Sequence, residues 1–469
     1  MLTKNNYITG LKCKKKMNLD RVNKYEISAE ILQNAIEFKK IVQSNFNNIL
    51  IINKDSLEEK IKETKNALKK NQIIGNAYFK SSNMLVKIDI LEKTKTGYNI
   101  YDIKSSTAEK EDYINELAYN YYVASHILKI DKAFLVQPHK IEVVDKFNPK
   151  DMVLYKDKTE EIKNIMNSVA INTYLLKEAI EQNCLEYEIN YKCRVNSVDC
   201  PYFKECLNIK KGNIFDLSGI PFNKKIDYFN KGIITKEDII KDGTLNAKRE
   251  ELLNTISINK KEINNFLRTI EYPISYLDFE TVSFLVPRYK HHTVNSKIAI
   301  QYSLHVKEKN NLFHYYNIEK ANTDPRRKIA EHLVKNIPKK GSIIVYHASF
   351  ESSVLANLAE LYSDLKEDLL NMRERLIDLE IIFKNKYYYD PLFYGSSSIK
   401  AVLPTLFPND EELNYKKFKH VHNGLEAASY LRQDNYSDEI KKDLLEYCKL
   451  DTLAMVKIHE FLNNLIKNN

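Results

Sequence analysis

Two acidic residues, Asp278 and Glu280, stand two positions apart in the apolar stretch ISYLDFET. This stretch predicts a buried β-strand, and side chains at positions i and i+2 of a strand point to the same face of a sheet. Burying two carboxylates costs free energy unless another group compensates their charge. A divalent cation such as Mg²⁺ or Mn²⁺ can do so, because hard cations bind carboxylate oxygens and substrate phosphates. The pair therefore predicts a metal site, although Asp-x-Glu also arises often by chance.

A second set of chemically useful residues lies in the N-terminal half. The runs 84–93 and 98–106 predict two strands joined by a Gly-containing turn. Asp89 lies on the first strand, whereas Asp102 and Lys104 share one face of the second. Carboxylates that hold Mg²⁺, beside a lysine that orients the attacking water, suit phosphodiester hydrolysis. The alternative, which these three residues alone favour, is a half-exposed hairpin with ordinary polar residues on its wet face.

A helix and a further strand are predicted after this hairpin, within residues 111–137. The order of strand with Asp, strand with acidic-x-Lys, helix and strand resembles the core of the PD-(D/E)XK nucleases, in particular their RecB-like branch. The resemblance implies that Asp89, Asp102 and Lys104 are catalytic and that the two aspartates bind the metal. The chain departs from the family pattern at Asp102, where Glu is commoner, and at Asn120, where Gln is usual.

The chain has six cysteines, which do not make a disulfide scaffold in 469 residues. Several RecB-like nucleases bind an iron–sulfur cluster with one cysteine before the nuclease core and three after it. Four cysteines resemble this arrangement, and thiolates are suitable ligands for such a cluster: Cys13, Cys193, Cys200 and Cys206. Zinc is the alternative, because four cysteines at irregular spacing also suit tetrahedral Zn²⁺, and reduced thiols without a metal are the third interpretation. Cys184 and Cys448 are expected to be ordinary buried thiols.

Residues that could complete the first acidic pair occur in two distant segments. Glu351 stands at the start of a helix that follows the buried strand predicted at 342–349. Tyr447 and Asp451 lie four positions apart on a long C-terminal helix and therefore share a face of that helix. Four carboxylates and a tyrosine can thus be assembled around one centre.

The segments YLDFET, YHASFE and YCKLD resemble the three motifs of the DnaQ-like (DEDD) exonucleases, which have a ribonuclease H-like fold. The match is to the subgroup with a tyrosine four residues before the last Asp. The resemblance implies that Asp278, Glu280, Glu351 and Asp451 bind two metal ions, roughly 3.5 to 4 Å apart, and that Tyr447 orients the attacking water. Glu351 stands where these enzymes usually have Asp.

Aromatic and basic residues alternate between the second and third motifs, in KNKYYYDPLFYGSSSIKAVLP at 384–404. Aromatic rings that stack on bases, beside cations that hold phosphates, bind single strands without sequence preference. A core-packing aromatic loop explains the same residues equally well.

Composition sets the broad class of the protein. Hydrophobic residues make up 43% and charged residues 29%, which is typical of a globular chain. The net charge of +9 suits a phosphate-rich partner, although lysine-rich solvated faces give the same balance. No apolar run approaches the roughly 20 residues of a membrane span, and the N-terminus lacks a signal-peptide core. A cytoplasmic protein with no membrane partner is expected.

Both halves together resemble a bacterial family of uncharacterised proteins that fuses a RecB-like nuclease to a DnaQ-like exonuclease. The resemblance implies an α/β chain with a PD-(D/E)XK restriction-endonuclease-like domain at 1–210, a helical connector at 211–272, and a ribonuclease H-like domain with a mixed sheet at 273–469. The implied function is Mg²⁺- or Mn²⁺-dependent hydrolysis of DNA, or of RNA, with 3′–5′ exonuclease activity in the C-terminal domain and a second nuclease site in the N-terminal one. The alternative is a nucleic-acid-binding scaffold with one or both sites inactive. No protein partner is implied.

Overall fold

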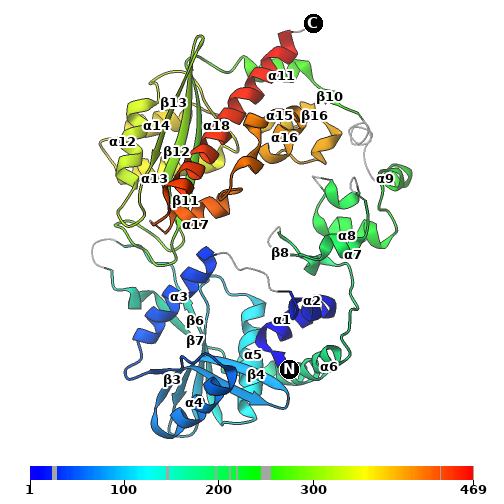
Figure 1. The fold of residues 1–469 in the computed structure, drawn as a ribbon, viewed down its shortest axis with the longest axis vertical. Coiled ribbons are helices and arrows are strands. Elements are labelled where there is room, and N and C mark those ends of the chain that lie inside the picture. Colours follow the sequence, from blue (N-terminus) through cyan, green and yellow to red (C-terminus); the bar gives the residue numbers. More distant parts are fainter. Residues whose placement is uncertain are drawn as a thin grey trace. The chain divides into compact units, whose positions relative to one another are not determined.

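The computed structural model describes residues 1–23, 29–143, 147–195, 198–210, 213–217, 220–243, 255–433 and 435–467. The chain divides into two compact units (Figure 1). Unit 1 comprises Met1–Cys206 and Phe284–Ser296, and unit 2 comprises Leu207–Ser283 and Lys297–Asn469. Each unit combines helices with a mixed sheet, so the α/β class is confirmed.

Unit 1 is built on a seven-stranded sheet of order β2-β3-β4-β5-β6-β7, with β1 paired to β4. Strands β3, β4 and β5 are antiparallel neighbours, whereas β5 and β6 run parallel because helix α5 connects them. The strands are β1 (Leu2–Thr3), β2 (Leu50–Ile51), β3 (Ile73–Ser81), β4 (Met84–Lys93), β5 (Tyr98–Ile103), β6 (Ile130–Pro138) and β7 (Val153–Asp157). The short strands β8 (Arg194–Val195) and β9 (Val198–Asp199) form a separate pair.

Helices cover both faces of this sheet. Neighbouring residues of β5 and β6 alternate between two apolar clusters: Ile100 and Leu135 pack with α1, α5 and α6, and Tyr101 and Val136 pack with α3. The helices are α1 (Lys4–Lys12), α2 (Lys14–Asp20), α3 (Ala29–Ser44), α4 (Leu57–Lys70), α5 (Glu111–Ser125) and α6 (Thr159–Glu181), with the short turns η1 (Pro149–Met152) and η2 (Tyr191–Cys193). Helix α7 (Phe203–Leu207) ends unit 1.

The segment Phe284–Ser296 links two strands of unit 2 but packs in unit 1. Its apolar residues Leu285, Val286 and Val294 are buried in the α3 cluster, and the Leu285 N–H donates to Asn34 Oδ1 at 3.2 Å. The predicted boundaries differ here, because they placed all of 273–469 in one domain. Burial of the three apolar side chains against unit 1 explains the difference. Most of the predicted connector groups with unit 2.

Unit 2 contains a five-stranded mixed sheet of order β13-β12-β11-β14-β15. Strands β11, β12 and β13 are antiparallel neighbours, and β14 and β15 run parallel to β11. Its strands are β11 (Ile274–Ser283), β12 (Lys297–Glu308), β13 (Asn311–Ile318), β14 (Ile343–Val345) and β15 (Leu376–Asp378). A separate two-stranded pair is formed by β10 (Ser257–Ile258) and β16 (Tyr388–Tyr389).

The helices of unit 2 lie on both sides of the sheet (Figure 1). Helices α12 (Arg326–Asn336), α13 (Ser349–Leu361) and α14 (Lys366–Glu374) pack on one face, and the long helix α18 (Asp438–Lys467) packs on the other. The remaining helices are α8 (Phe222–Asn230), α9 (Lys236–Asp242), α11 (Lys260–Leu267), α15 (Ile381–Lys384), α16 (Ile399–Leu406) and α17 (Gly424–Leu431), with the turns η3 (Ile214–Asp216), η4 (Pro391–Phe393), η5 (Glu411–Leu413) and η6 (Tyr415–Lys417).

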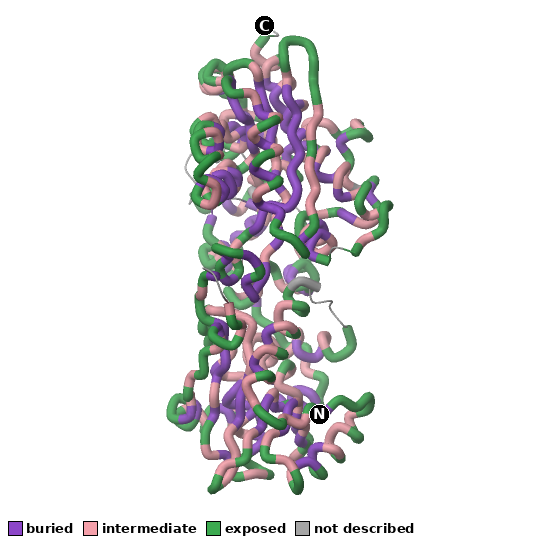
Figure 2. Tube along the Cα trace, turned by 90° about the vertical axis from the view of Figure 1, so that its left-hand side faces the viewer, coloured by how far each residue is buried: buried purple, intermediate pink, exposed green. Residues whose placement is uncertain are grey.

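Strand β11 sends alternate side chains to these two layers. Leu277 and Phe279 are buried in the cluster formed with α12 and α13. Tyr276 points to the other face, where its hydroxyl lies 2.7 Å from His459 Nδ1 on α18. Asp278 and Glu280 follow at the same parity, so they lie on the α18 face. Buried residues run along the strands in the interior of each unit (Figure 2).

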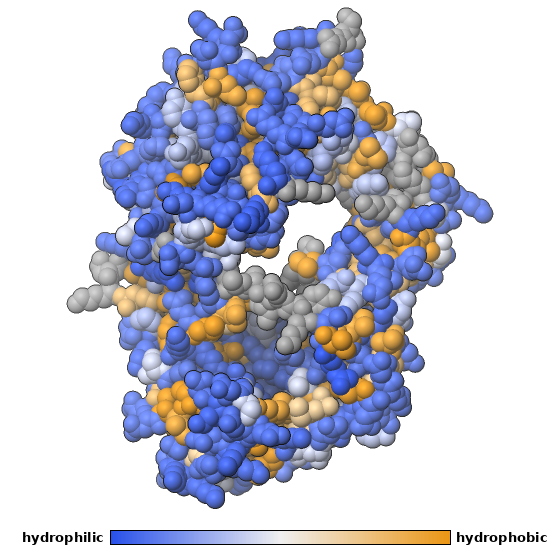
Figure 3. All heavy atoms as spheres, in the orientation of Figure 1, coloured by the Kyte–Doolittle hydropathy of each residue, from blue (hydrophilic) through white to orange (hydrophobic). Residues whose placement is uncertain are grey.

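The outer surface is largely polar. The face drawn in Figure 3 is mostly hydrophilic, with hydrophobic residues in small patches. Among the described residues, no helix has the length and apolarity needed to cross a membrane.

Candidate functional site

The main candidate site is formed by carboxylates from β11 and α18. One carboxylate oxygen from each of Asp278, Glu280 and Asp451 lies within 4.8 Å of the other two. We call these residues the carboxylate triad. Oxygen ligands at such spacing suit a hard divalent cation. The triad could therefore hold a metal ion. Asp451 lies 171 or more positions after the other two residues in the chain and joins them because α18 packs on β11.

The triad carries more negative charge than its surroundings neutralise. Burial, together with the charges of Asp451 and Glu280, raises the pKa of Asp278 well above its usual range. Burial and Asp451 raise the pKa of Glu280 to about 8, and burial raises the pKa of Asp451 to about 6. Raised pKa values of this kind are expected where carboxylates crowd together without a counter-cation.

Two neighbours of the triad were not expected from the sequence. The Tyr415 hydroxyl donates a hydrogen bond to Asp451 Oδ1 at 2.5 Å. The Cys448 thiol is buried as predicted, but its Sγ also lies 3.6 Å from Asp278 Oδ2. The position of Cys448 beside Tyr447 in the third motif could have indicated this contact, whereas no sequence signal connects Tyr415 to the site.

Among the described residues, Lys400 is the lysine whose charge acts on the triad. Its positive charge lowers the pKa values of Glu280 and Asp451, against the larger effect of burial. Its Nζ lies 5.7 Å from the ring centre of Tyr415 and 5.6 Å from that of Tyr447. Contacts at this range are cation–π interactions. Lys400 is thus held beside the triad by two tyrosine rings.

Tyr447 is buried beside the triad, and burial raises its pKa. Its ring centre lies 5.7 Å from that of Tyr415. The predicted placement of Tyr447 and Asp451 on one helix is confirmed, since both belong to α18. The phenol of Tyr447 therefore stands protonated next to the carboxylates.

Glu351 lies close to the triad but outside its 4.8 Å group. It occupies the first turn of α13, as predicted, and its charge contributes to the raised pKa of Asp278. The side chain is only 2% exposed, and within the described chain its Oε2 has no hydrogen-bond partner. Burial, with a smaller contribution from Asp378, raises the pKa of Glu351 to about 8. Burying a carboxylate oxygen without a hydrogen-bond partner costs free energy. Such an atom is typical of a site that binds an ion or another ligand.

The aromatic segment at 384–400 has two roles. Tyr388, Tyr389 and Phe393 are buried and pack against one another, which agrees with the core-packing interpretation. Tyr394 is exposed, and Lys400 faces the triad. The core-packing interpretation therefore holds for most of the aromatic residues but not for the end of the segment.

The N-terminal candidate site is a group of carboxylates paired with lysines. Asp102, on β5, is 1% exposed and forms ion pairs with Lys104 at 2.6 Å and Lys4 at 3.1 Å. Both lysines also pair with Glu116 of α5, Lys4 at 3.2 Å. Asp89, on β4, pairs with Lys39 of α3. We call the six residues the lysine-paired cluster: Lys4, Lys39, Asp89, Asp102, Lys104 and Glu116.

This cluster has the opposite electrostatic balance to the triad. Burial alone would raise the pKa of Asp102, but the ammonium groups of Lys104 and Lys4 lower it to about 2. The Asn120 side chain donates to Asp102 Oδ1 at 3.3 Å, and the Ile103 N–H donates to Asp89 Oδ2 at 3.0 Å. Three charged residues that the sequence did not indicate therefore pair with the predicted Asp89, Asp102 and Lys104. They are Lys4, Lys39 and Glu116.

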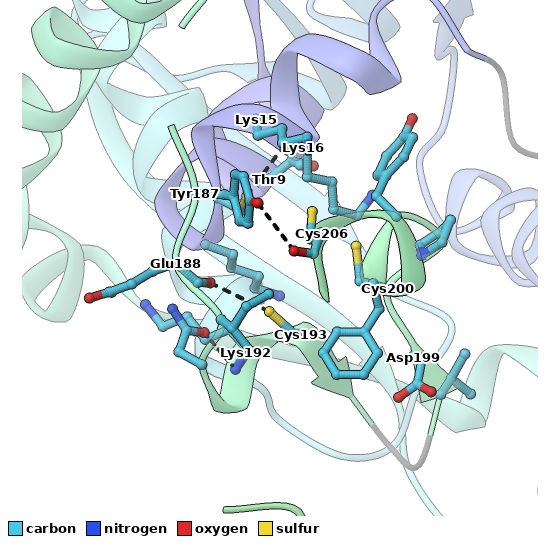
Figure 4. Close-up of a pocket in the computed structure, with 18 of the residues that line it drawn as sticks. Thr9, Lys15, Lys16, Tyr187, Glu188, Lys192, Cys193, Asp199, Cys200 and Cys206 are labelled. Carbon is cyan, nitrogen blue, oxygen red and sulfur yellow. Dashed lines mark hydrogen bonds between the residues drawn. The ribbon is translucent and has the colours of Figure 1, made fainter. Parts of the chain in front are cut away.

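The four predicted cysteines converge in unit 1. Cys13, Cys193, Cys200 and Cys206 line one cavity of about 380 Å³, together with Lys12, Lys15, Lys16 and Lys192 (Figure 4). We call these cysteines the cysteine cluster. Burial raises the pKa values of Cys193, Cys200 and Cys206, so a metal would have to displace their protons. The surrounding lysines would offset the negative charge of bound thiolates.

The thiols of the cysteine cluster do not form a closed tetrahedral site. Four sulfur atoms around one tetrahedral Zn²⁺, at Zn–S distances of about 2.3 Å, lie about 3.8 Å from one another. Within the described part of the chain, no three sulfur atoms of the cysteine cluster come within 4.8 Å of one another. Thiolates are suitable ligands both for Zn²⁺ and for an iron–sulfur cluster.

Two comparisons with known proteins match part of the chain. Residues 275–398 match a family described as a domain of unknown function (DUF2779). The chain is also 28% identical over 217 residues to the uncharacterized protein MG366 of Mycoplasma genitalium. The matched region covers 41% of this chain and 32% of that protein. The chain thus spans about a third of the length of this relative. The family match includes Asp278, Glu280 and Glu351 but ends before Asp451.

Proposed function

We propose that this chain is a metal-dependent nuclease that hydrolyses phosphodiester bonds, with the carboxylate triad as its main site. The convergence of Asp278, Glu280 and Asp451 from distant segments carries the proposal. The strand order of unit 2, with three antiparallel strands and two parallel ones, supports a ribonuclease H-like fold. A 3′–5′ exonuclease acting on DNA, or on RNA, is the activity proposed for this unit.

The residues present suit Mg²⁺ or Mn²⁺. Asp278, Glu280 and Asp451 would hold the metal, with Glu351 beside them, because all four are oxygen donors in a site with excess negative charge. A bound divalent metal supplies positive charge that offsets the charge of the phosphate and favours ionisation of the attacking water.

The other side chains have distinct roles in this proposal. The protonated Tyr447 phenol orients the attacking water, since it lies beside the triad and its O–H is able to donate a hydrogen bond. The Lys400 ammonium attracts the scissile phosphate and offsets the charge that develops on it. The Tyr415 hydroxyl holds the Asp451 carboxylate in place. Tyr447 and Lys400 thus act on the water and the phosphate, and Tyr415 acts on a carboxylate of the triad.

Unit 1 is proposed to carry a second nuclease site in the lysine-paired cluster. Its antiparallel strands β3–β4–β5, followed by α5 and the parallel strand β6, support a PD-(D/E)XK-like core. Asp89 and Asp102 would bind the metal, and Lys104 would orient the attacking water. In this proposal the cysteine cluster binds an iron–sulfur cluster, which links Cys13 to Cys193, Cys200 and Cys206.

The test is a cleavage assay on end-labelled single- and double-stranded DNA and RNA with Mg²⁺, Mn²⁺ or EDTA. Asp278→Ala should abolish the exonuclease products, and Asp102→Ala should abolish any that come from unit 1. Glu446→Ala is the matched control for the triad, because Glu446 lies on the same helix and pairs with Lys449 at 3.4 Å. A wild-type protein that degrades no substrate with either metal would refute the proposal.

The second candidate function is a nucleic-acid-binding scaffold in which one or both sites do not turn over. The complete pairing of Asp89, Asp102 and Glu116 with lysines favours it for unit 1. Cleavage that is lost in Asp278→Ala and unchanged in Asp102→Ala would support this assignment for unit 1.

A further inference from the structure

We infer that Lys4 is a resident counter-cation of the lysine-paired cluster, and that a divalent metal enters this site only when a phosphate of the bound strand draws Lys4 away. Metal and strand therefore bind unit 1 cooperatively. The inference rests on the proposed nuclease function of unit 1. It differs from that proposal in assigning Lys4 a role in the order of binding.

The backbone holds Lys4 at the cluster. The preceding strand β1 pairs with β4, where Leu2 lies opposite Met84, and Leu2 is fully buried. The Tyr119 hydroxyl donates to the Leu2 carbonyl at 2.8 Å. Thr3 caps helix α1, since its Oγ1 accepts the Asn6 N–H at 3.2 Å. Lys4 is the first residue of that helix, so its side chain leaves a fixed point.

Lys4 and Lys104 bridge the same two carboxylates. The Lys4 Nζ lies 3.1 Å from Asp102 Oδ1 and 3.2 Å from Glu116 Oε2. Lys104 pairs with Asp102 Oδ2 and with the same Glu116 oxygen. Lys39 neutralises Asp89. The three carboxylates of the cluster are thus matched by three ammonium groups, and no net negative charge is left to attract a dication.

A metal that takes an oxygen of Asp102 must break an existing ion pair. The Lys4 side chain is only 22% exposed, so its ammonium would lose its partner in a place where water compensates it poorly. A phosphate oxygen of a bound strand provides a new partner for that ammonium. Metal entry is therefore costly without the strand and favourable with it, which is a coupling between two ligands.

Metal binding at the carboxylate triad is expected to depend less on the strand. Its carboxylates have raised pKa values and lie near one basic side chain, Lys400. Among the described residues, no lysine forms an ion pair with these three carboxylates, so a metal that enters there relieves repulsion without displacing one. We therefore expect the triad to bind metal without the strand, whereas the lysine-paired cluster needs both.

The experiment measures Mn²⁺ binding to the full chain by electron paramagnetic resonance. Asp278→Ala is present throughout to weaken binding at the triad. Each variant is titrated alone and with a short phosphorothioate single-stranded DNA that resists cleavage, and DNA alone is subtracted. We expect the DNA to raise Mn²⁺ affinity at least about tenfold in the Asp278→Ala parent, and Asp102→Ala should remove this binding.

The decisive variant is Lys4→Met, combined with Asp278→Ala. It should raise Mn²⁺ affinity without DNA by about tenfold and abolish the further effect of DNA. Lys163→Met is the matched control, because Lys163 is also a lysine of unit 1 in an ion pair, with Glu160 at 2.9 Å, outside the lysine-paired cluster. It should behave like the parent. Lys4→Gln replaces Lys4→Met if circular dichroism shows that the latter does not fold.

The outcomes separate the two proposals. Equal Mn²⁺ affinities in the Lys4 variant and the Lys163 control, or a parent whose affinity does not respond to DNA, would overturn the role of Lys4 even if unit 1 cleaves DNA. Tighter Mn²⁺ binding in the Lys4 variant, with no cleavage by the wild type, would support the role of Lys4 and refute the nuclease proposal.

Discussion

The hydroxyl of Tyr415 donates a hydrogen bond of 2.5 Å to Oδ1 of Asp451. The bond fixes one carboxylate of the triad from η6, a segment outside all three predicted motifs. It also stabilises the ionised form of Asp451 and so lowers its pKa, against burial, which raises the pKa to about 6. Tyr415 thereby helps keep a metal ligand charged.

Tyr415→Phe should weaken metal binding more at low pH than at high pH. Loss of a hydrogen bond to a carboxylate raises the carboxylate pKa, and such bonds contribute about 1.5–3 kcal/mol. We expect Mn²⁺ affinity to fall about tenfold at pH 6 and less at pH 8, where Asp451 ionises in either protein. Titration at both pH values measures this, with the exposed Tyr394→Phe as control. An equal loss at both values would contradict it.

The metal-free protein should become less stable as pH rises from about 6.5 to about 8. Below this range the buried His305, His314 and His459 act in the opposite direction, because burial lowers their pKa values. The pKa values of Glu280 and Glu351 are about 8 in the folded protein, and about 4.3 for an unperturbed Glu. The folded state therefore holds protons that the unfolded state has released, and raising the pH costs up to about 1.4 kcal/mol per pH unit for each group. Asp102 adds no slope here, because its lowered pKa of about 2 affects stability only at lower pH.

Thermal unfolding in EDTA across this pH range measures the effect. Mg²⁺ or Mn²⁺ should remove most of the decline, and Glu351→Gln should reduce it and raise the unfolding temperature at pH 8 by a few degrees. Glu331→Gln is the matched control, because Glu331 pairs with Arg327 on the surface of the same unit. Stability that rises between about pH 6.5 and pH 8 would show that the carboxylates are compensated in some other way.

Lys400→Ala should weaken the binding of single-stranded DNA. The Lys400 ammonium lies beside the triad and above two tyrosine rings, where a strand phosphate would meet it. Loss of one phosphate contact should reduce the slope of log affinity against log salt by about one. Fluorescence anisotropy at several salt concentrations tests this in the presence of Ca²⁺. Lys417→Ala, whose ammonium donates to the Glu412 carbonyl, should leave the slope unchanged.

Protein purified without air should be brown and contain iron. The four thiols of the cysteine cluster line one cavity, and four thiolates are suitable ligands for an iron–sulfur cluster. Cys193→Ser should lose the colour and most of the iron, whereas Cys184→Ser should keep both, because Cys184 packs against the apolar core of unit 1. A colourless wild type with one zinc ion per chain would rule out the iron–sulfur cluster.

Local sequence patterns were sufficient to predict much of the fold. The hairpin predicted at 84–93 and 98–106 is confirmed by the antiparallel pairing of β4 and β5. Strand β7 was not predicted, because it has only five residues and is stabilised by pairing with β6. Strand β15 has three residues and is stabilised by pairing with β14 rather than by its own pattern.

The residues of the candidate sites also fall into two groups: those that a local sequence pattern predicts and those that it does not. Asp278 and Glu280 were predictable from the i, i+2 rule, and Tyr447 with Asp451 from the i, i+4 rule. Lys4 was not, since 98 residues separate it from Asp102 and no local pattern links the two. Partners that only tertiary packing brings together leave no periodic signal in one sequence.

The path of the chain through residues 284–296 limits how the protein can be divided. After Met1–Cys206 the chain enters unit 2, returns to unit 1 for thirteen residues at Phe284–Ser296, and re-enters unit 2 at Lys297. A truncation at residue 206 would strip Phe38 and Val42 of the apolar side chains that cover them, and a fragment starting at 273 would carry those side chains uncovered. Each half expressed alone should therefore aggregate unless residues 284–296 are grafted onto the first and replaced by a short polar loop in the second.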